Sequence, residues 1–169
     1  MLLVHPTAKP PTDPNTGLPV SDVAARFAFL EAEIQSANET ILIPTPALAE
    51  VLVRLGDAGP TVLDRISRSA RFKIAEFDTM AAVEVAAMTR DALRAGDKRA
   101  GSKSDWQKVK IDRQIIAIAK LRGATKIYSD DRGVALFAEA LGIEVIQTWK
   151  MPLPPPPPPS LFDEYEPRF

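Results

Sequence analysis

From residue 40 onward, short apolar segments alternate with helical segments, and this order constrains the fold more than any other feature. The apolar segments predict strands at residues 40–43, 71–77, 125–129 and 143–148. Capping residues, glycines and apolar periodicity predict helices at residues 45–56, 60–69, 78–95, 104–121 and 133–141. Strands that alternate with helices in this way form a mainly parallel sheet covered by helices. The sequence therefore predicts a three-layer α/β fold.

The two ends of the chain differ from this central part. Residues 5–19 hold five of the sixteen prolines and predict an extended loop, which a helix at residues 21–37 follows. Six consecutive prolines at residues 154–159 predict polyproline II. We therefore expect one domain over residues 1–149 and a proline-rich, acidic and aromatic tail over residues 150–169.

Composition narrows the classes of function. The formal net charge of −1 excludes a globally basic nucleic-acid binder, and the lack of cysteine excludes thiol nucleophiles, disulfides and cysteine-based zinc sites. No apolar run approaches the roughly 20 residues of a membrane span, and the first residues lack the order of a signal peptide. We expect a cytoplasmic protein without membrane contact, in which carboxylates carry any chemistry.

Asp112 is the most informative of the carboxylates. It falls inside the apolar stripe of its helix, which Ile111, Ile115 and Ile116 help to form. A carboxylate that faces a core is costly unless it is paired or binds a metal ion. The alternatives to a functional role are an ion pair with Lys108, one turn earlier, and a position at the rim of the apolar stripe.

Asp131 and Glu50 lie at two other junctions between elements. Asp131 directly follows a predicted strand, and ligand sites in parallel sheets gather at the carboxyl ends of strands. The alternatives are that Asp131 is a helix N-cap or part of an Asp-Asp-Arg-Gly turn. Glu50 lies away from the apolar face of its helix, where a surface pair with Arg54 is the alternative.

Three motifs in the predicted order resemble those of PIN domains. The segments ILIP (residues 41–44) and ALAEV (residues 47–51) resemble the family's second strand and acid-bearing helix. The segment IDRQIIAIA (residues 111–119) is similar to the central acid helix, and IYSDD (residues 127–131) resembles the hydroxyl-x-Asp signature after the fourth strand. The similarity covers roughly residues 40–147.

PIN domains, which include VapC-type toxins, are Mg²⁺- or Mn²⁺-dependent ribonucleases. The resemblance implies Glu50, Asp112 and Asp131 as metal ligands and Ser129 as the hydroxyl that orients the site, with Asp130 as a further metal ligand in reserve. It also implies RNA as substrate, an antitoxin protein as partner, and a homodimer.

One part of the family pattern is missing. PIN domains open with a central strand that ends in an Asp-x-Asn-type motif, whereas Met1-Leu2-Leu3-Val4 resembles only the residues after that acid. Asp13 and Asp22 lie in a loop and at a helix cap, and neither replaces it. Because loss of a central strand leaves two sheet edges unpaired, we expect this sequence to begin downstream of that strand. The alternative is a catalytically inactive PIN-like module that binds RNA or a protein. A receiver-like domain would need paired acids after its first strand, and these are missing.

RNA binding requires positive charge close to the site. Residues 90–113 contain eight basic and four acidic residues, a local net charge of +4. The loop at residues 96–103 is the predicted phosphate contact, and Trp106 could stack on a base. The alternative is a solvated loop with Trp106 in the core.

Overall fold

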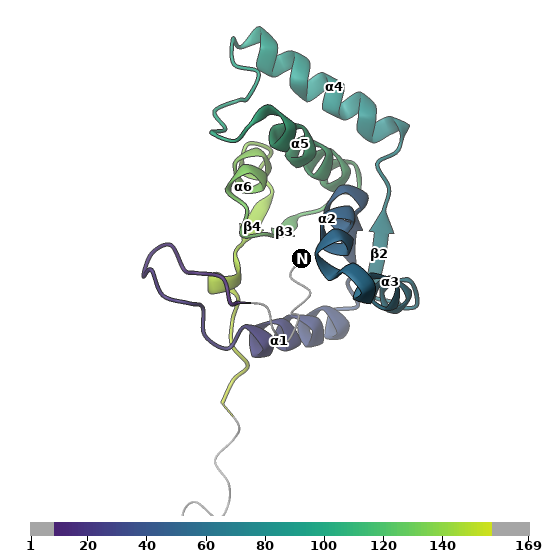
Figure 1. Ribbon diagram of the computed structural model, residues 1–169, viewed down its shortest axis with the longest axis vertical. Helices are drawn as coiled ribbons and strands as arrows, with labels where there is room; N and C mark the ends of the chain where they lie inside the picture. Colours follow the sequence, from purple (N-terminus) through teal and green to yellow (C-terminus); the bar gives the residue numbers. More distant parts are fainter. Residues whose placement is uncertain (1–8, 157–169) are drawn as a thin grey trace, which may run out of the picture.

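The computed structural model describes residues 9–156, in which helices and short strands alternate as predicted (Figure 1). The elements are α1 (Val23–Ser36), β1 (Ile41–Pro44), α2 (Thr45–Leu55), the 3-10 turn η1 (Gly56–Ala58), α3 (Gly59–Ser67), β2 (Phe72–Ala75), α4 (Thr79–Arg94), α5 (Trp106–Leu121), β3 (Lys126–Tyr128), α6 (Arg132–Glu139), β4 (Glu144–Ile146) and the 3-10 turn η2 (Thr148–Lys150). The predicted order from residue 40 onward is confirmed. Most of the predicted proline-rich tail lies outside the described residues.

The four strands form two separate parallel pairs. In one pair β1 lies beside β2, with Ile41 opposite Phe72, and in the other β3 lies beside β4, with Lys126 opposite Glu144. The prediction of an α/β chain with parallel strands is confirmed. Within residues 9–156 the strands do not join into one continuous sheet, because β1 pairs only with β2 and β3 only with β4.

Several boundaries differ from the predicted ones because other side chains cap the backbone. Helix α5 begins after Asp105 instead of Ser104, since the Asp105 carboxylate accepts a hydrogen bond from the Lys108 backbone N–H at 2.9 Å. Strand β2 is shorter than predicted. The chain leaves it before Phe77, whose N–H donates to the Thr45 hydroxyl at 3.0 Å, and Asp78 then caps α4.

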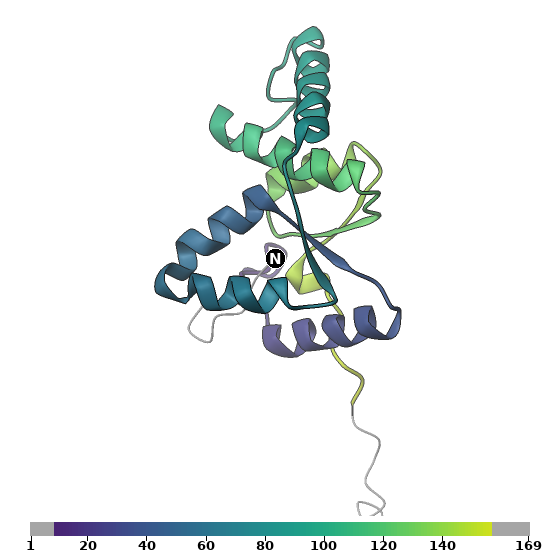
Figure 2. The same ribbon diagram turned by 90° about the vertical axis from the view of Figure 1, so that its right-hand side faces the viewer.

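Helix α5 is the centre of the packing. It contacts α4 on one side and α6 on another, while α1 lies at the opposite end of the molecule from α4 (Figures 1 and 2). Val109, Ile116 and Ala117 of α5 are fully buried. Because this helix contacts α2, α4, α6 and β1, it can bring residues from distant parts of the chain to one place. Among the described helices, none is long and apolar enough to cross a membrane.

Candidate functional site

Asp112 lies in the buried face of α5, as the sequence predicts. Its side chain is only 2% exposed. The helix presents this position to α6, and Gly133 of α6 directly faces the carboxylate. A side chain at position 133 would collide with Asp112, because a Cβ there would lie well inside van der Waals contact of Oδ2 and 3.1 Å from Cγ. The glycine therefore makes room for the carboxylate.

Asp131 is the N-cap of α6, and its two oxygens have different partners. Oδ1 accepts hydrogen bonds from the backbone N–H groups of Gly133 at 2.7 Å and Val134 at 3.3 Å. The backbone N–H of Asp131 donates to the Ser129 hydroxyl at 3.1 Å. The cap and this turn hold the carboxylate in place and leave Oδ2 outside the cap hydrogen bonds.

Lys108 joins the two carboxylates. Its ammonium nitrogen donates to Asp112 Oδ1 at 3.0 Å and to Asp131 Oδ2 at 2.6 Å. Lys108 and Asp112 are four residues apart on α5, whereas Asp131 comes from the β3–α6 junction. The structure thus contains the predicted Lys108–Asp112 pair. It also shows what the sequence did not, namely that one positive group holds both carboxylates.

The electrostatics of the two acids differ. Burial raises the pKa of Asp112, and the nearby charges of Asp131 and Glu50 add to the rise, although the Lys108 ammonium opposes it. Burial alone would also raise the pKa of Asp131, but hydrogen bonds from Lys108, Gly133 and Val134 outweigh burial and lower it. For Lys108, the two carboxylates overcome burial and raise its pKa. The raised pKa of Lys108 and the lowered pKa of Asp131 both favour the charged forms of these groups, so the Lys108 ammonium is stabilised between the two acids.

One oxygen of the cluster has no hydrogen-bond partner. Asp112 Oδ2 is buried and accepts no hydrogen bond from the described residues. A buried carboxylate oxygen without a partner is costly, and a cation or an ordered donor would relieve that cost. Asp112 Oδ2 is therefore the oxygen of the cluster that still lacks a donor among the described residues.

The other predicted site residues differ in whether they interact with Asp112 and Asp131. Glu50 is exposed on α2, which packs against α5, and its charge reaches Asp112. Asp130 is directed elsewhere, because its two oxygens accept hydrogen bonds from the backbone N–H and the hydroxyl of Thr148, both at 2.7 Å. Asp130 anchors the turn after β4. Ser129 supports Asp131 by accepting its backbone N–H.

A hard cation requires converging oxygen ligands. Within residues 9–156, no group of three or more acidic or histidine side chains is arranged to hold a metal ion. Two carboxylates do converge, and Mg²⁺ commonly binds through one or two carboxylates while it keeps several waters. Asp112 Oδ1 and Asp131 Oδ2, which now share the Lys108 ammonium, are the two oxygens that could hold such an ion.

The sequence predicts Lys108 as a partner of Asp112 but does not predict its contact with Asp131. It predicts Gly133 only as the start of a helix and not as the residue that faces Asp112. Local signals for both residues are present in the sequence. Lys108 precedes Asp112 by one turn, and a glycine two residues after an N-cap is a weak helix former, which suggests a close contact at that position.

The basic loop and Trp106 form a separate cluster next to this site. Arg113 of α5 is 1% exposed and donates to the Thr89 hydroxyl at 3.1 Å and to the Lys98 carbonyl at 2.8 Å. The Trp106 ring lies 5.6 Å from the Arg113 guanidinium and 5.4 Å from the Lys98 ammonium. Trp106 thus packs between cations and the core, in line with the alternative interpretation.

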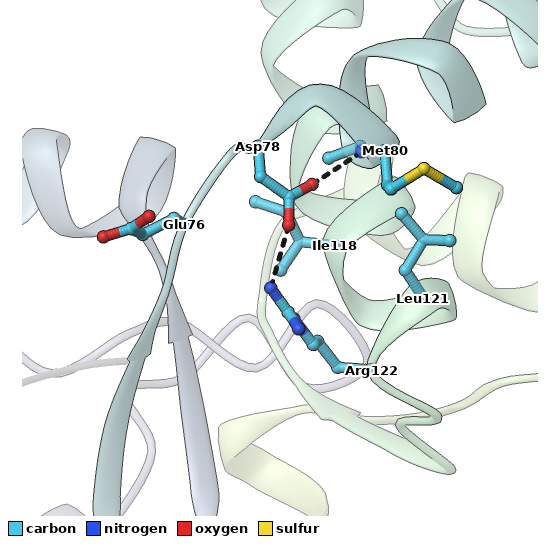
Figure 3. A pocket seen from close by; sticks show the side chains of 7 residues that line it. Glu76, Asp78, Met80, Ile118, Leu121 and Arg122 are labelled. Atoms are coloured by element: carbon cyan, nitrogen blue, oxygen red, sulfur yellow. Dashed lines mark hydrogen bonds and ion pairs between the residues drawn. The ribbon is translucent and has the colours of Figure 1, made fainter.

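A small hollow lies on another part of the surface, between the start of α4 and the end of α5 (Figure 3). There Asp78 accepts a hydrogen bond from the Ala81 backbone N–H at 2.9 Å and pairs with Arg122 at 3.0 Å. The hollow measures about 170 Å³, which is below the roughly 300 Å³ of the smallest ligand pockets. This arrangement serves to join α4 to α5.

Comparison with known proteins adds no assignment. No protein-family model matches the chain, and a search of curated proteins found no match.

Proposed function

We propose that this protein is a PIN-type, metal-dependent endoribonuclease with a three-layer α/β fold, and that it acts as the toxin of a toxin–antitoxin pair. The observation that carries the proposal is the convergence of Asp112 and Asp131 on one positive group. These acids come from α5 and from the β3–α6 junction, and both pair with Lys108. The resemblance to PIN domains implies both of them as metal ligands.

Asp112 and Asp131 would hold Mg²⁺ or Mn²⁺, because carboxylate oxygens are the preferred ligands of these ions. A bound cation of this kind supplies an activated water and neutralises charge on a phosphodiester. The chain supplies the rest. Ser129 and the first turn of α6 keep Asp131 in place, and Glu50 contributes negative charge from the exposed side.

Lys108 is the competitor for this position. Its ammonium now satisfies one oxygen from each acid, so a divalent cation must displace it or share the carboxylates with it. The Lys108 side chain is 40% exposed and can turn toward solvent. A half-exposed lysine next to the two acids is also suited to contact an RNA phosphate.

RNA contact is supported by the exposed positive charge beside the site. Lys98, Arg99 and Lys103 are exposed in the loop that joins α4 to α5. Arg113 holds this loop to α5 through the Lys98 carbonyl. The loop is therefore a fixed basic surface next to the acids, which suits a polyanion that must approach a negative site.

A second candidate function is a catalytically inactive PIN-like module that binds RNA or a protein. The observation that favours it is Lys108 itself, which balances the two carboxylates without a metal ion. The two candidates differ in a measurable way. Only a nuclease would cleave RNA in a reaction that depends on a divalent cation held by Asp112.

The test is cleavage of a fluorescently labelled single-stranded RNA by the purified protein with and without Mg²⁺ or Mn²⁺. We expect metal-dependent cleavage that Asp112→Asn or Asp131→Asn reduces by roughly 100-fold, the scale for loss of one key electrostatic contact. The control is Asp64→Asn, since the Asp64 carboxylate pairs with Arg68 on the exposed face of α3 and with no other residue between 9 and 156. Unchanged cleavage by Asp112→Asn would reject the nuclease. RNA binding without metal-dependent cleavage would establish the binding module.

A further inference from the structure

Arg113 is a charged side chain that the proposed chemistry does not use, although it is almost completely buried. This residue of α5 is 1% exposed. A buried charge is normally paired with an opposite charge, yet none of the ion pairs among residues 9–156 includes Arg113. Its guanidinium nitrogens instead donate to two uncharged oxygens, the Thr89 hydroxyl at 3.1 Å and the Lys98 carbonyl at 2.8 Å.

Two aromatic rings complete the surroundings of this guanidinium. The centre of the Trp106 ring lies 5.6 Å from it, and the centre of the Phe137 ring lies 5.5 Å from it. The Lys98 ammonium lies 5.4 Å from the centre of the same Trp106 ring. Rings at such distances stabilise a cation electrostatically. The contacts therefore form a cation–aromatic cluster, in the order Lys98, Trp106, Arg113 and Phe137.

This cation–aromatic cluster extends from the surface to the core. Lys98 is exposed in the loop that joins α4 to α5, and Trp106 is half-buried at the start of α5. Phe137 is 5% exposed and belongs to the core cluster between α5 and α6. Because Arg113 and Phe137 are buried, a ligand cannot reach them. The Lys98 ammonium is the charged group of the cluster that a ligand can reach.

One face of α6 ties this cluster to the acidic site. Gly133 and Phe137 are four residues apart, so they lie on the same face of α6. Gly133 faces Asp112, and Phe137 faces Arg113, which is the next residue of α5. The packing of α6 on α5 (Figure 1) that accommodates the Asp112 carboxylate therefore also positions the Arg113 guanidinium.

The loop that carries Lys98 is closed by its own hydrogen bonds. The Asp97 carboxylate accepts hydrogen bonds from the backbone N–H groups of Arg99 at 2.9 Å and Gly101 at 2.7 Å. These bonds hold the turn in one shape but do not attach it to α5. Arg113 provides that attachment, because it donates from α5 to the Lys98 carbonyl within the turn.

We propose that Arg113 is a positioning residue for RNA binding, which fixes the backbone of Lys98 so that the Lys98 ammonium contacts a phosphate of single-stranded RNA. This inference rests on the proposed function, because it takes RNA as the ligand. The planar guanidinium suits the role, since its fork donates to two acceptors in a fixed geometry. A lysine whose backbone and ammonium are already held loses less conformational freedom on binding than a free surface lysine does.

The test is the binding of fluorescently labelled single-stranded RNA, measured by anisotropy at several salt concentrations in EDTA. The variants are Lys98→Gln, Arg113→Met and the double variant. Methionine keeps a flexible apolar side chain between the two rings and removes both hydrogen bonds. The control is Lys73→Gln, since Lys73 is an exposed lysine on β2, away from this loop (Figure 1). Urea unfolding shows whether each variant is folded.

For Lys98→Gln we expect the slope of log affinity against log salt to be shallower by about 0.7, the value for one phosphate contact on a single strand. At about 0.1 M salt this change corresponds to roughly fivefold weaker binding. Arg113→Met should weaken binding by a similar factor. The double variant should bind as Lys98→Gln does, because Arg113 acts through Lys98. Lys73→Gln should match the wild type.

Wild-type affinity in Lys98→Gln would overturn the proposal, and so would additive losses in the double variant. If Arg113→Met does not fold, Arg113→Lys replaces it, because a lysine keeps the buried charge but not the two-pronged fork. Wild-type affinity in that variant would equally overturn the positioning role.

Binding in EDTA separates this inference from the proposed nuclease. A wild-type protein that binds RNA in this way but does not cleave it with Mg²⁺ or Mn²⁺ would reject the nuclease and support the role of Arg113 and Lys98. Absence of salt-dependent RNA binding by the wild type would overturn the inference, whatever the result of the cleavage assay.

Discussion

At the scale of single residues, the site contains two acids whose pKa values are shifted in opposite directions. Asp131 is stabilised in its charged form by Lys108 and by two backbone N–H groups. Asp112 is buried and held with a raised pKa. A cation between the two acids stabilises both charged forms, because it offsets the cost of burying the Asp112 carboxylate and binds the Oδ2 oxygen of Asp131.

The opposite shifts predict opposite pH dependences of stability. The folded-state pKa of Asp131 lies below its ordinary value of 3.8, so its contribution is present above that pH and is lost as the pH falls through the folded-state pKa. The folded-state pKa of Asp112 lies above 3.8. Its contribution is therefore fully present below that pH and is lost as the pH rises through the folded-state pKa.

Urea unfolding between about pH 3 and pH 7 checks this prediction. Asp131→Asn should cost about 1 kcal/mol or less at neutral pH, since the pair with Lys108 is part-exposed, and the cost should shrink in acid. Relative to the wild type, Asp112→Asn should become more stable as the pH rises. Parallel pH profiles for the two variants would contradict the assignment.

At the scale of elements, the site depends on the close approach of α6 to α5. Gly133 allows this approach, and Asp131 at the start of α6 is placed by the same contact. The distance between α5 and α6 therefore also determines how close the two carboxylates lie to each other. A change that separates the helices should weaken both stability and metal binding.

Gly133→Ala tests this coupling. Alanine normally stabilises a helix by about 1 kcal/mol relative to glycine, but here its Cβ would overlap with Asp112. We expect a net loss of about 1–3 kcal/mol in the free energy of unfolding, as in overpacked cores. The control is Gly59→Ala in α3, where the Cβ would make an ordinary 3.4 Å contact with Leu52. If Gly133→Ala were more stable than the wild type, the space between position 133 and Asp112 would be large enough for a methyl group, which would contradict the predicted overlap.

The elements themselves were largely predictable from the sequence, and their association was not. Apolar alternation and caps such as Asp78 are local signals, so the order of strands and helices is confirmed. Asp112 can be identified from the sequence because a charged side chain within the apolar stripe of a helix is costly unless it is paired. The contact of Lys108 with Asp131 spans 23 residues. It depends on tertiary packing, which no local pattern encodes.

At the scale of the whole molecule, α5 links the acidic site to the two strand pairs. It carries Lys108 and Asp112 at one part of its length, and at another Ile115 and Ile118, which line a cavity between the two strand pairs. Among the described residues, the molecule thus combines a two-acid centre with two separate parallel strand pairs.

The central claim is that Asp112 and Asp131 form one cation site for which Lys108 competes. Calorimetric titration of Mn²⁺ into the wild type, Asp112→Asn and Lys108→Met tests it most directly. We predict one site in the wild type, affinity lower by roughly 10- to 100-fold in Asp112→Asn, and higher affinity in Lys108→Met because the competing ammonium is gone. Identical Mn²⁺ affinity in all three proteins would contradict the claim.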